Sequence, residues 1–536
     1  MTCERTARMP RRRLAGTALA AGTTVILLAG GGSTALAARA APAGGIISTV
    51  AGGVGGPGPG TGISLSDANA APGGCSLSTV AFAAGSLYIA DGSVRKVSAR
   101  TGLLTTPAGT GAAGPLTLGG PAPTAALGAC GVTFDRAGNL VIADHLRRRI
   151  DVVPPRTGTF YGRAMTAGHL YPVAGDGAHG AGGSGVPAAS TALNGPFDVA
   201  VDAAGNIVIA DAGFRNPGPQ IGSRVRVVAE STGTFYGQPM TAGDIYTVAG
   251  SVSGTGGSGD GGPAADAALG TFLLGIRVDA AGNLVLATVD NSRVRVVAAA
   301  TGTFYGVSMT AGDIYSVAGG GSGGTANGIP AIQATLMGPG GVALDRAGNL
   351  LLSDSSDNLV RVVAARTGTS YGQPMTAGDI YTIAGGGSGA PHLGDGGPAT
   401  DATLGGPTGL TVDAAGNVAI TDFGDQRVRI VAESTGTFYG QPMTAGDIYT
   451  VAGTGKADYC CDGMPAATAE MNGPAAVATD RTGDMAIADE TDQRIRFVAG
   501  ATGTFLGQPM AAGDIYTVAG DGKQGFPDNG LSLIHI

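Results

Sequence analysis

Short apolar stretches separated by turn residues follow one another along most of the chain. One stretch ends in Asp, as at residues 199–202, a second follows a Gly-Asn pair, as at residues 206–211, and a third begins with Arg, as at residues 224–228. A fourth ends in Ala-Gly, as in IYTVAG at residues 245–250. The stretches are short, rich in β-branched residues and bounded by Gly, Asn or Asp, so the pattern predicts β-strands rather than helices.

This set of stretches repeats with a period of about 67 residues. The first three stretches occur together at residues 80–97, 132–153, 199–228, 276–297, 342–363, 410–431 and 477–498. Tandem units of four antiparallel strands are typical of β-propellers, in which each blade covers the sheet faces of its neighbours. We therefore predict an all-β protein, a β-propeller of seven four-stranded antiparallel blades over residues 46–520.

The number of blades stays open between seven and eight, because the fourth strand has eight copies. The first copy, at residues 46–52, would close the ring by pairing with the last blade, but residues 515–520 already fill that position. Either the first copy is redundant or an eighth blade followed in the untruncated protein. Residues 521–530 begin like a further inter-blade loop, and residues 531–536 match no blade. We interpret this last hexapeptide as a non-native, adapter-derived tail.

The composition is unusual for a folded protein. Glycine accounts for 98 of the 536 residues and charged residues for 13%, which is close to the composition of low-complexity chains. Hydrophobic residues nevertheless make up 43% of the chain, more than intrinsically disordered chains contain. The period explains the glycines, because most of them fall at strand ends, Gly-Asn turns and inter-blade loops.

The N-terminal segment has the pattern of an export signal. Five arginines precede an apolar stretch, and Ala35-Leu36-Ala37 fits a cleavage site, so we predict a signal peptide at residues 1–37 and a linker at residues 38–45. An uncleaved membrane anchor is the alternative. Cleavage leaves a net charge of about −12, which speaks against nucleic-acid binding. We expect a secreted, extracellular protein that has no membrane contact after cleavage.

Two acidic positions recur in the units. The first opens an Asp-x-x-Gly-Asn sequence, as at residues 202–206, which suits a tight hairpin; calcium binding is the alternative. The second ends the second strand and precedes an Arg that begins the third. We predict structural ion pairs there, because catalytic groups would not repeat around the ring. The predicted pairs are Asp144–Arg149, Asp211–Arg224, Asp422–Arg427 and Asp489–Arg494.

An insert with the sequence TFYGQPMTAGD separates the third and fourth strands. It occurs at residues 234–244 and 437–447, with variants at 159–169, 303–313, 369–379 and 504–514, and the first unit lacks it. We predict a hairpin extension near the outer edge of each later blade. Its aromatic residues either fold back over the blade or form an exposed row that binds a partner or a polysaccharide. The candidate contact residues are Phe235, Tyr236, Met240, Tyr305, Tyr371, Phe438 and Tyr439.

Four cysteines remain after the predicted leader, namely Cys75, Cys130, Cys460 and Cys461. An even number in an exported chain permits disulfides in three connectivities. Cys75 and Cys130 both precede or begin innermost strands of adjacent blades, so we predict a bridge between them. Cys460 and Cys461 then form a vicinal disulfide or stay free. Zinc binding is the alternative, but the chain has no Cys-x-x-Cys spacing.

The whole unit resembles a known family. The sequence PFDVAVDAAGNIVIAD at residues 196–211, followed by RVRVV and TVAG, is similar to the NHL repeats of β-propellers, particularly those of secreted bacterial proteins and the teneurin type. The resemblance covers residues 46–520 and implies the propeller fold. It implies little about activity, because one fold hosts many functions.

Some propellers of this general shape are metal-dependent enzymes, such as amidating lyases, streptogramin lyases and gluconolactonases. The histidines that remain here, His145, His169, His179 and His392, fall outside the innermost strands and form no recognisable catalytic set. We therefore expect a monomeric, non-catalytic binding or scaffold module, without a cofactor, that recognises a protein or a cell-wall glycan at the cell surface. The contacts would come from the inter-blade loops at the hub or from the hairpin extensions. A propeller lyase or lactonase with a hub-centred site is the alternative.

Overall fold

The computed structural model of the protein describes residues 58–59, 80–110, 119–212, 221–252, 256–271, 273–387 and 393–522. The predicted signal peptide, the linker, the first TVAG copy, the C-terminal hexapeptide, Cys75 and His392 lie outside these residues. Within the described ranges, no helix is both long enough and apolar enough to cross a membrane.

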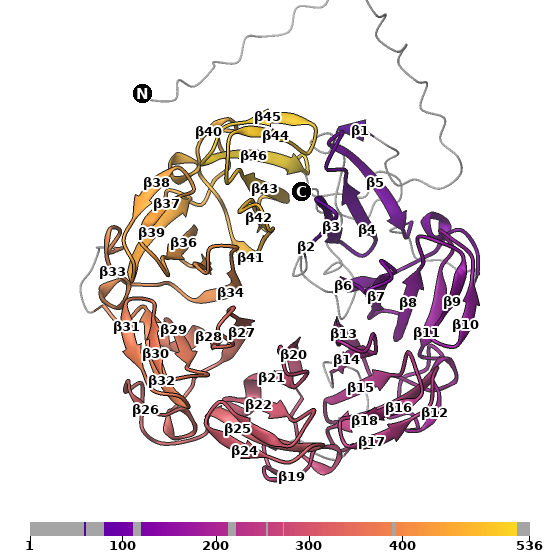
Figure 1. Ribbon diagram of the computed structural model, residues 1–536. Coiled ribbons are helices and arrows are strands. Elements are labelled where there is room, and N and C mark those ends of the chain that lie inside the picture. Colours follow the sequence, from indigo (N-terminus) through magenta and orange to yellow (C-terminus); the bar gives the residue numbers. More distant parts are fainter. Residues whose placement is uncertain are drawn as a thin grey trace, which may run out of the picture. The chain divides into compact units, whose positions relative to one another are not determined.

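The described residues form a seven-bladed β-propeller, which confirms the predicted fold (Figure 1). Antiparallel pairing runs from an innermost strand at the hub to a fourth strand at the rim. The innermost strands are β2 (Val80–Ala83), β6 (Ala129–Phe134), β13 (Pro196–Val201), β20 (Leu273–Val278), β27 (Pro339–Leu344), β34 (Pro407–Val412) and β41 (Pro474–Thr479). The second strands are β3 (Ser86–Ala90), β7 (Leu140–Asp144), β14 (Ile207–Asp211), β21 (Leu284–Thr288), β28 (Leu350–Asp354), β35 (Val418–Asp422) and β42 (Met485–Asp489).

The outer half of each blade also repeats. The third strands are β4 (Val94–Val97), β8 (Arg149–Val153), β15 (Arg224–Val228), β22 (Arg293–Val297), β29 (Leu359–Val363), β36 (Arg427–Val431) and β43 (Arg494–Val498). The fourth strands are β5 (Leu103–Ala108), β11 (Tyr171–Ala174), β18 (Asp244–Ala249), β25 (Asp313–Gly319), β32 (Asp379–Ala384), β39 (Asp447–Ala452) and β46 (Asp514–Ala519).

A short fifth strand on the outer edge was not predicted. The chain crosses the rim of the next blade before it turns inward, and two of its residues pair there with the fourth strand. These strands are β1 (Gly58–Pro59), β12 (Val186–Pro187), β19 (Gly262–Pro263), β26 (Ile329–Pro330), β33 (Gly397–Pro398) and β40 (Met464–Pro465). Blade two has a single bridge from Pro121 to His169 instead. Proline is tolerated at such an edge because its missing N–H would face away from the sheet.

Single 3₁₀ turns are the helical elements of the described chain. Five follow the edge strands, one follows the bridge at Pro121, and two lie between second and third strands. The first six are η3 (Ala122–Thr124), η4 (Ala188–Ser190), η5 (Ala264–Asp266), η7 (Ala331–Gln333), η9 (Ala399–Asp401) and η10 (Ala466–Thr468). The other two are η6 (Val289–Asn291) and η8 (Ser355–Asp357).

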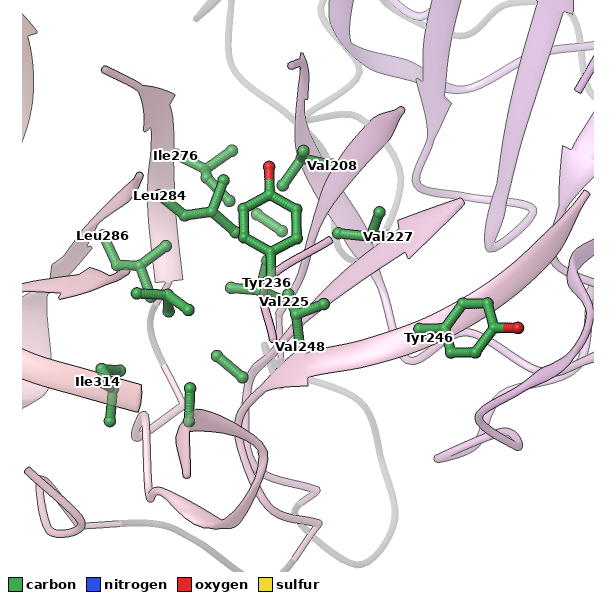
Figure 2. Close-up of a cluster of buried hydrophobic side chains, with 14 of the residues drawn as sticks. Val208, Val225, Val227, Tyr236, Tyr246, Val248, Ile276, Leu284, Leu286 and Ile314 are labelled. Atoms are coloured by element: carbon green, nitrogen blue, oxygen red, sulfur yellow. The ribbon is translucent and has the colours of Figure 1, made fainter. Parts of the chain in front are cut away.

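Apolar packing between neighbouring blades forms the core. Successive residues of a strand point to opposite sheet faces, and here both faces are covered. Val208 packs in the cluster between blades three and four, whereas the next residue, Ile209, packs between blades two and three. Figure 2 shows the first of these clusters, where Val208 faces Ile276 and Leu284 of the following blade. Full burial of such side chains contributes about 1.5–3 kcal/mol each.

The first and last blades close the ring by side-chain packing. Leu87 and Ile89 of blade one lie in one buried cluster with Ala486 and Phe497 of blade seven. The outer position of blade seven is filled by β46, as the sequence predicts. An eighth blade would have to insert between blades one and seven and would break the contacts of this cluster.

Candidate binding site in the hub

The Asp-x-x-Gly-Asn turns join first and second strands on one side of the ring, which we call the turn side. In blade three, Asp202 Oδ1 accepts a hydrogen bond of 2.9 Å from the Asn206 backbone N–H, and Oδ2 accepts one of 2.8 Å from Asn206 Nδ2. Gly205 has a φ of +91°, which favours glycine. Asn206 Oδ1 in turn accepts a 3.0 Å hydrogen bond from the Glu230 N–H after the third strand. The turn carboxylates are thus engaged within the fold.

The predicted inserts are hairpins in blades two to seven. Their strands are β9 (Gly158–Phe160) with β10 (Arg163–Met165), β16 (Gly233–Phe235) with β17 (Gln238–Met240), β23 (Gly302–Phe304) with β24 (Val307–Met309), β30 (Gly368–Ser370) with β31 (Gln373–Met375), β37 (Gly436–Phe438) with β38 (Gln441–Met443), and β44 (Gly503–Phe505) with β45 (Gln508–Met510). The hairpins also touch one another. Gly237 of blade three lies against Ala311 and Gly312 of blade four, and a Cβ at Gly237 would meet that backbone at 2.9–3.2 Å.

The tyrosine at the hairpin tip of blades two to six is buried and hydrogen-bonds the turn of its own blade. The Tyr236 hydroxyl donates a 2.9 Å hydrogen bond to Asp202 Oδ2, and the side chain is 5% exposed. Burial, followed by the nearby Asp202, raises the pKa of Tyr236, so the hydroxyl remains a donor. Equivalent bonds are Tyr161–Asp135, Tyr305–Asp279, Tyr371–Asp345 and Tyr439–Asp413, at 2.9–3.1 Å.

Most of the candidate contact residues on the hairpins are therefore covered. Tyr236, Met240, Tyr305, Tyr371 and Tyr439 are buried, and Phe235 and Phe438 are half-buried against the inter-blade clusters. Of the two alternatives, the folded-back arrangement is the one observed for the five buried side chains. They form no exposed row.

The hydroxyl–carboxylate link was not predicted from the sequence, although one blade without the tyrosine points to it. Blade seven has Leu506 in place of the tyrosine. There the turn compensates, because the Thr482 hydroxyl donates a 2.6 Å hydrogen bond to Asp480. Blade one lacks the hairpin and lacks the turn aspartate as well.

The Asp/Arg pairs lie opposite one another across the strands as expected, but most carboxylates face another arginine. Asp144, Asp211, Asp422 and Asp489 pair in register with Arg149, Arg224, Arg427 and Arg494. Asp211 meets its partner, with 2.8 Å between Asp211 Oδ2 and Arg224 Nη2. The ion-pair partner of the other three carboxylates is Arg147 for Asp144, Arg429 for Asp422 and Arg496 for Asp489, at 3.6–3.9 Å.

The second arginine of the third strand is fully buried and binds the inter-blade loop through hydrogen bonds and ion pairs. Arg295 Nε donates a 2.9 Å hydrogen bond to Asp260, and Nη1 donates one of 2.8 Å to the Ala268 carbonyl. Arg429 and Arg496 reach Asp395 and Asp462 in the same way, at 2.8 and 3.2 Å. Asp260 and Asp395 belong to a Gly-Asp-Gly sequence before the edge strand, and Asp462 occupies the same position in a Cys-Asp-Gly sequence, so the three aspartates bind the arginine from equivalent loops.

The cysteines also lie in these loops or at a strand start. Cys460 and Cys461 form a vicinal disulfide, and Arg496 Nη2 donates 3.3 Å hydrogen bonds to both of their carbonyls. Cys130 is the second residue of β6. Its predicted partner Cys75 lies outside the described residues.

Two cavities of the hub are lined by described residues. One of about 420 Å³ is lined by the middle of the innermost strands, including Phe197 and Val199 of β13. Its charged groups are Asp198 and Arg277, with 3.1 Å between Asp198 Oδ2 and Arg277 Nη1. The Arg277 side chain is 50% exposed. This pair has no counterpart among the other described innermost strands and breaks the sevenfold repeat.

The second cavity, of about 760 Å³, opens at the turn side. It is lined by the ends of β2, β27, β34 and β41 and by the turns that follow them. Its lining residues include the exposed Arg346 and Arg481 and the half-buried Phe82, which also packs against the cluster between blades one and seven. Neither guanidinium forms an ion pair with any described residue.

The three carboxylates of this second cavity are held by their own turns. Asp345 accepts from the Asn349 N–H and from the Tyr371 hydroxyl, and Asp413 and Asp480 accept equivalent turn hydrogen bonds. The arginines are therefore the charged groups of the cavity that are left to bind a ligand.

None of the described histidines lines either cavity, although His145 packs against Phe197, which lines the first. His169 Nδ1 lies 2.8 Å from the Gly119 carbonyl, and His179 Nε2 lies 2.7 Å from Asn194 Oδ1. His145 packs edge-on against Phe197, with 6.2 Å between ring centres, and burial lowers its pKa. Among the described residues, no three His, Cys, Asp or Glu side chains gather in a group able to hold a metal ion.

No protein-family model and no curated protein sequence matches this chain. Among solved structures, virginiamycin B lyase of Staphylococcus aureus is 11% identical, with a TM-score of 0.37 over 73% of this chain and 83% of its own. An auxiliary nutrient binding protein of Bacteroides ovatus is 14% identical, with a TM-score of 0.38 over 71% of each chain. A gluconolactonase of Xanthomonas campestris is 14% identical, with a TM-score of 0.30 over 79% of this chain and 85% of its own. These structures are β-propellers, and their names say nothing about the function of this chain.

Proposed function

We propose that this protein is a secreted, non-catalytic binding propeller of the NHL type that recognises an acidic glycan at the turn side of its hub. The observation that carries the proposal is the 760 Å³ cavity, which is lined by Phe82 and by Arg346 and Arg481, two arginines that form no ion pair with a described residue. Cavities of this size that combine an aromatic wall with a few polar groups are typical ligand sites.

The two arginines occupy the second position of the Asp-x-x-Gly-Asn turns. Blade two also has an arginine there, Arg136, which does not line the cavity, and blades three, four and six have Ala203, Ala280 and Ala414. Since alanine occupies this position in three blades, the turn does not require an arginine. Guanidinium groups match carboxylate and phosphate geometry, with two parallel hydrogen bonds to one anionic group.

The anionic ligand class also fits the charge of the chain. The protein is acidic overall, with a formal net charge of −8, whereas the free charges of this cavity are cationic. Phe82 offers a flat apolar surface to a sugar ring beside these two charges. A uronic acid or a phosphate-bearing cell-wall sugar presents both features, an apolar ring face and an anion, in one residue.

Binding of charged and neutral oligosaccharides tests the proposal. We expect isothermal titration calorimetry to detect a uronic-acid oligosaccharide and not its neutral analogue, with affinity that falls as salt rises because the charges are exposed to screening. The double variant Arg346→Ala/Arg481→Ala should weaken binding at least tenfold, about 1.4 kcal/mol. Arg366→Ala, which removes an exposed arginine outside the cavity, is the matched control. Equal binding by both variants would refute the assignment.

The Asp198–Arg277 pair in the inner cavity favours a second candidate, a hub-centred lyase or lactonase. An ion pair that occurs in one place and lies on a channel wall offers an acid–base and anion-binding couple. Mass spectrometry of the titrated oligosaccharide separates the two candidates. Intact ligand supports the binding function, and conversion that is lost in Asp198→Asn would place the protein among the enzymes.

A further inference from the structure

One blade departs from the buried arginine of the third strand. Six blades carry that arginine with at most 2% exposure, at Arg95, Arg226, Arg295, Arg361, Arg429 and Arg496. Blade two has the sequence RIDVV in β8, so that Asp151 takes the position. A carboxylate therefore stands where the other blades bury a cation.

The register shows what Asp151 faces. In blade six, Ile420 lies opposite Arg429, and Arg429 Nη1 is 3.6 Å from Asp422 Oδ2. In blade two, Ile142 lies opposite Asp151 with the same offset from Asp144, the counterpart of Asp422. Asp151 and Asp144 thus extend from neighbouring strands on one sheet face. The guanidinium that neutralises the second-strand carboxylate in blades six and seven has been replaced by a second carboxylate.

The two side chains are buried and incompletely paired. Both are 0% exposed, and neither carboxylate oxygen of Asp151 accepts a hydrogen bond from a described residue. Asp144 Oδ1 accepts hydrogen bonds of 3.0 and 3.1 Å from the Gly128 and Arg147 backbone N–H groups, but Oδ2 accepts none. The ion-pair contact of this Oδ2 is Arg147 Nη1 at 3.9 Å. Both oxygens of Asp151 therefore lack a hydrogen-bond donor among the described residues, and Asp144 Oδ2 has a long ion-pair contact but no hydrogen bond.

Without a further cation this arrangement is costly. Burial, and then the negative charge of Asp144, raises the pKa of Asp151 to about 8, although Arg149 and Arg147 act in the opposite direction. Buried charges in proteins are normally paired or bound to a metal ion. The two arginines do not reach Asp151, since no ion pair joins them to it within the described chain.

We propose that Asp144 and Asp151 bind a calcium ion inside blade two, at the place that a guanidinium takes in blades six and seven. Carboxylate oxygens are the ligands that hard cations prefer, and two carboxylates supply up to four of the six to eight that Ca²⁺ takes, with carbonyls or water for the others. The ion would neutralise the pair as Arg429 and Arg496 neutralise Asp422 and Asp489. The inference is independent of the function proposed for the hub.

Equilibrium dialysis of the whole chain, followed by metal analysis, tests the site. At about 2 mM Ca²⁺, above the Kd of extracellular modules of roughly 0.1–1 mM, we expect one bound ion per chain and a higher unfolding temperature than in EDTA. Asp151→Asn should raise the Kd at least tenfold and remove the calcium dependence of the unfolding temperature. Asp422→Asn, which alters the equivalent carboxylate of a blade with its arginine, should retain both.

A second variant distinguishes the loss of the calcium site from misfolding of the chain. Asp151→Arg restores the residue of the other blades, so it should fold and be as stable in EDTA as in calcium. Equal calcium binding by wild type and Asp151→Asn would overturn the proposal. So would wild-type protein that binds no calcium and loses stability as pH rises from about 4 to about 8, because the pair would then hold a shared proton. Binding of Mg²⁺ in preference to Ca²⁺ would equally refute the calcium assignment.

Discussion

The hydroxyl–carboxylate link between a hairpin and the turn of its own blade predicts the cost of losing one oxygen atom. Tyr236→Phe removes the donor of the 2.9 Å hydrogen bond to Asp202 Oδ2 and leaves the ring in its cluster. A hydrogen bond to a charged group contributes about 1.5–3 kcal/mol. Asp202 Oδ2 keeps the 2.8 Å bond from Asn206 Nδ2, so we expect a loss in the lower part of that range, about 1.5–2 kcal/mol.

Urea unfolding followed by circular dichroism measures this loss, with the slope of the transition checked for a change in cooperativity. The matched control is Tyr246→Phe, whose hydroxyl accepts a 2.9 Å hydrogen bond from the Thr241 N–H and touches no charge. We expect that control to cost about 1 kcal/mol or less. If both variants lose the same stability, or if Tyr236→Phe stays within about 0.5 kcal/mol of wild type, a normal value for surface changes, the link is not stabilising.

Three further changes follow from the same contacts. Arg295→Met removes the hydrogen bonds that the arginine donates to Asp260 and to the Ala268 carbonyl of the inter-blade loop. The free energy of unfolding in urea should fall by about 3 kcal/mol, because one partner of a buried polar contact is lost. A fall below about 1 kcal/mol would contradict the role of the arginine. Leu506→Tyr supplies the hydroxyl that blade seven lacks, and should raise stability by about 1 kcal/mol if Asp480 accepts it; unchanged stability would mean that Thr482 already satisfies the turn. Burial, followed by Asp492, raises the pKa of Asp489 from 3.8 to about 7, so the folded state holds this proton more tightly and stability falls as pH rises across that interval. Asp489→Asn should reduce the fall of the thermal unfolding temperature between pH of about 4 and 7. An unaltered pH profile of the unfolding temperature would exclude the Asp489 carboxyl as the cause of that fall.

Much of the fold can be predicted from the sequence, because the pattern of each of the four main strands occurs in seven successive units. The third strand at residues 224–228 coincides with β15, and the hairpins occupy the predicted inserts. The fifth strands escaped prediction because two residues such as Gly262–Pro263 are too short for any alternation of apolar and polar positions. The closure between blades one and seven depends on packing of residues far apart in the chain, which no local pattern encodes.

The candidate site was harder to predict, because repetition conceals what differs. Arg346 and Arg481 share their turn position with Arg136 of blade two, so the sequence does not separate the arginines of the cavity from the one outside it. Asp151 sits in a strand that otherwise matches β15 and its equivalents, and it differs there from the arginine of the six other blades. Conversely, the conspicuous aromatic Tyr236 is structural, and its burial became visible only with the neighbouring blade in place.

A crystal structure with a bound acidic oligosaccharide would decide whether the hub acts as proposed. We expect the carboxylate of one sugar within hydrogen-bond distance of the guanidinium groups of Arg346 and Arg481, and the ring face against Phe82. Ligand density on the opposite side of the ring, among the inter-blade loops, or along the outer hairpins with the turn-side cavity unchanged, would contradict the account.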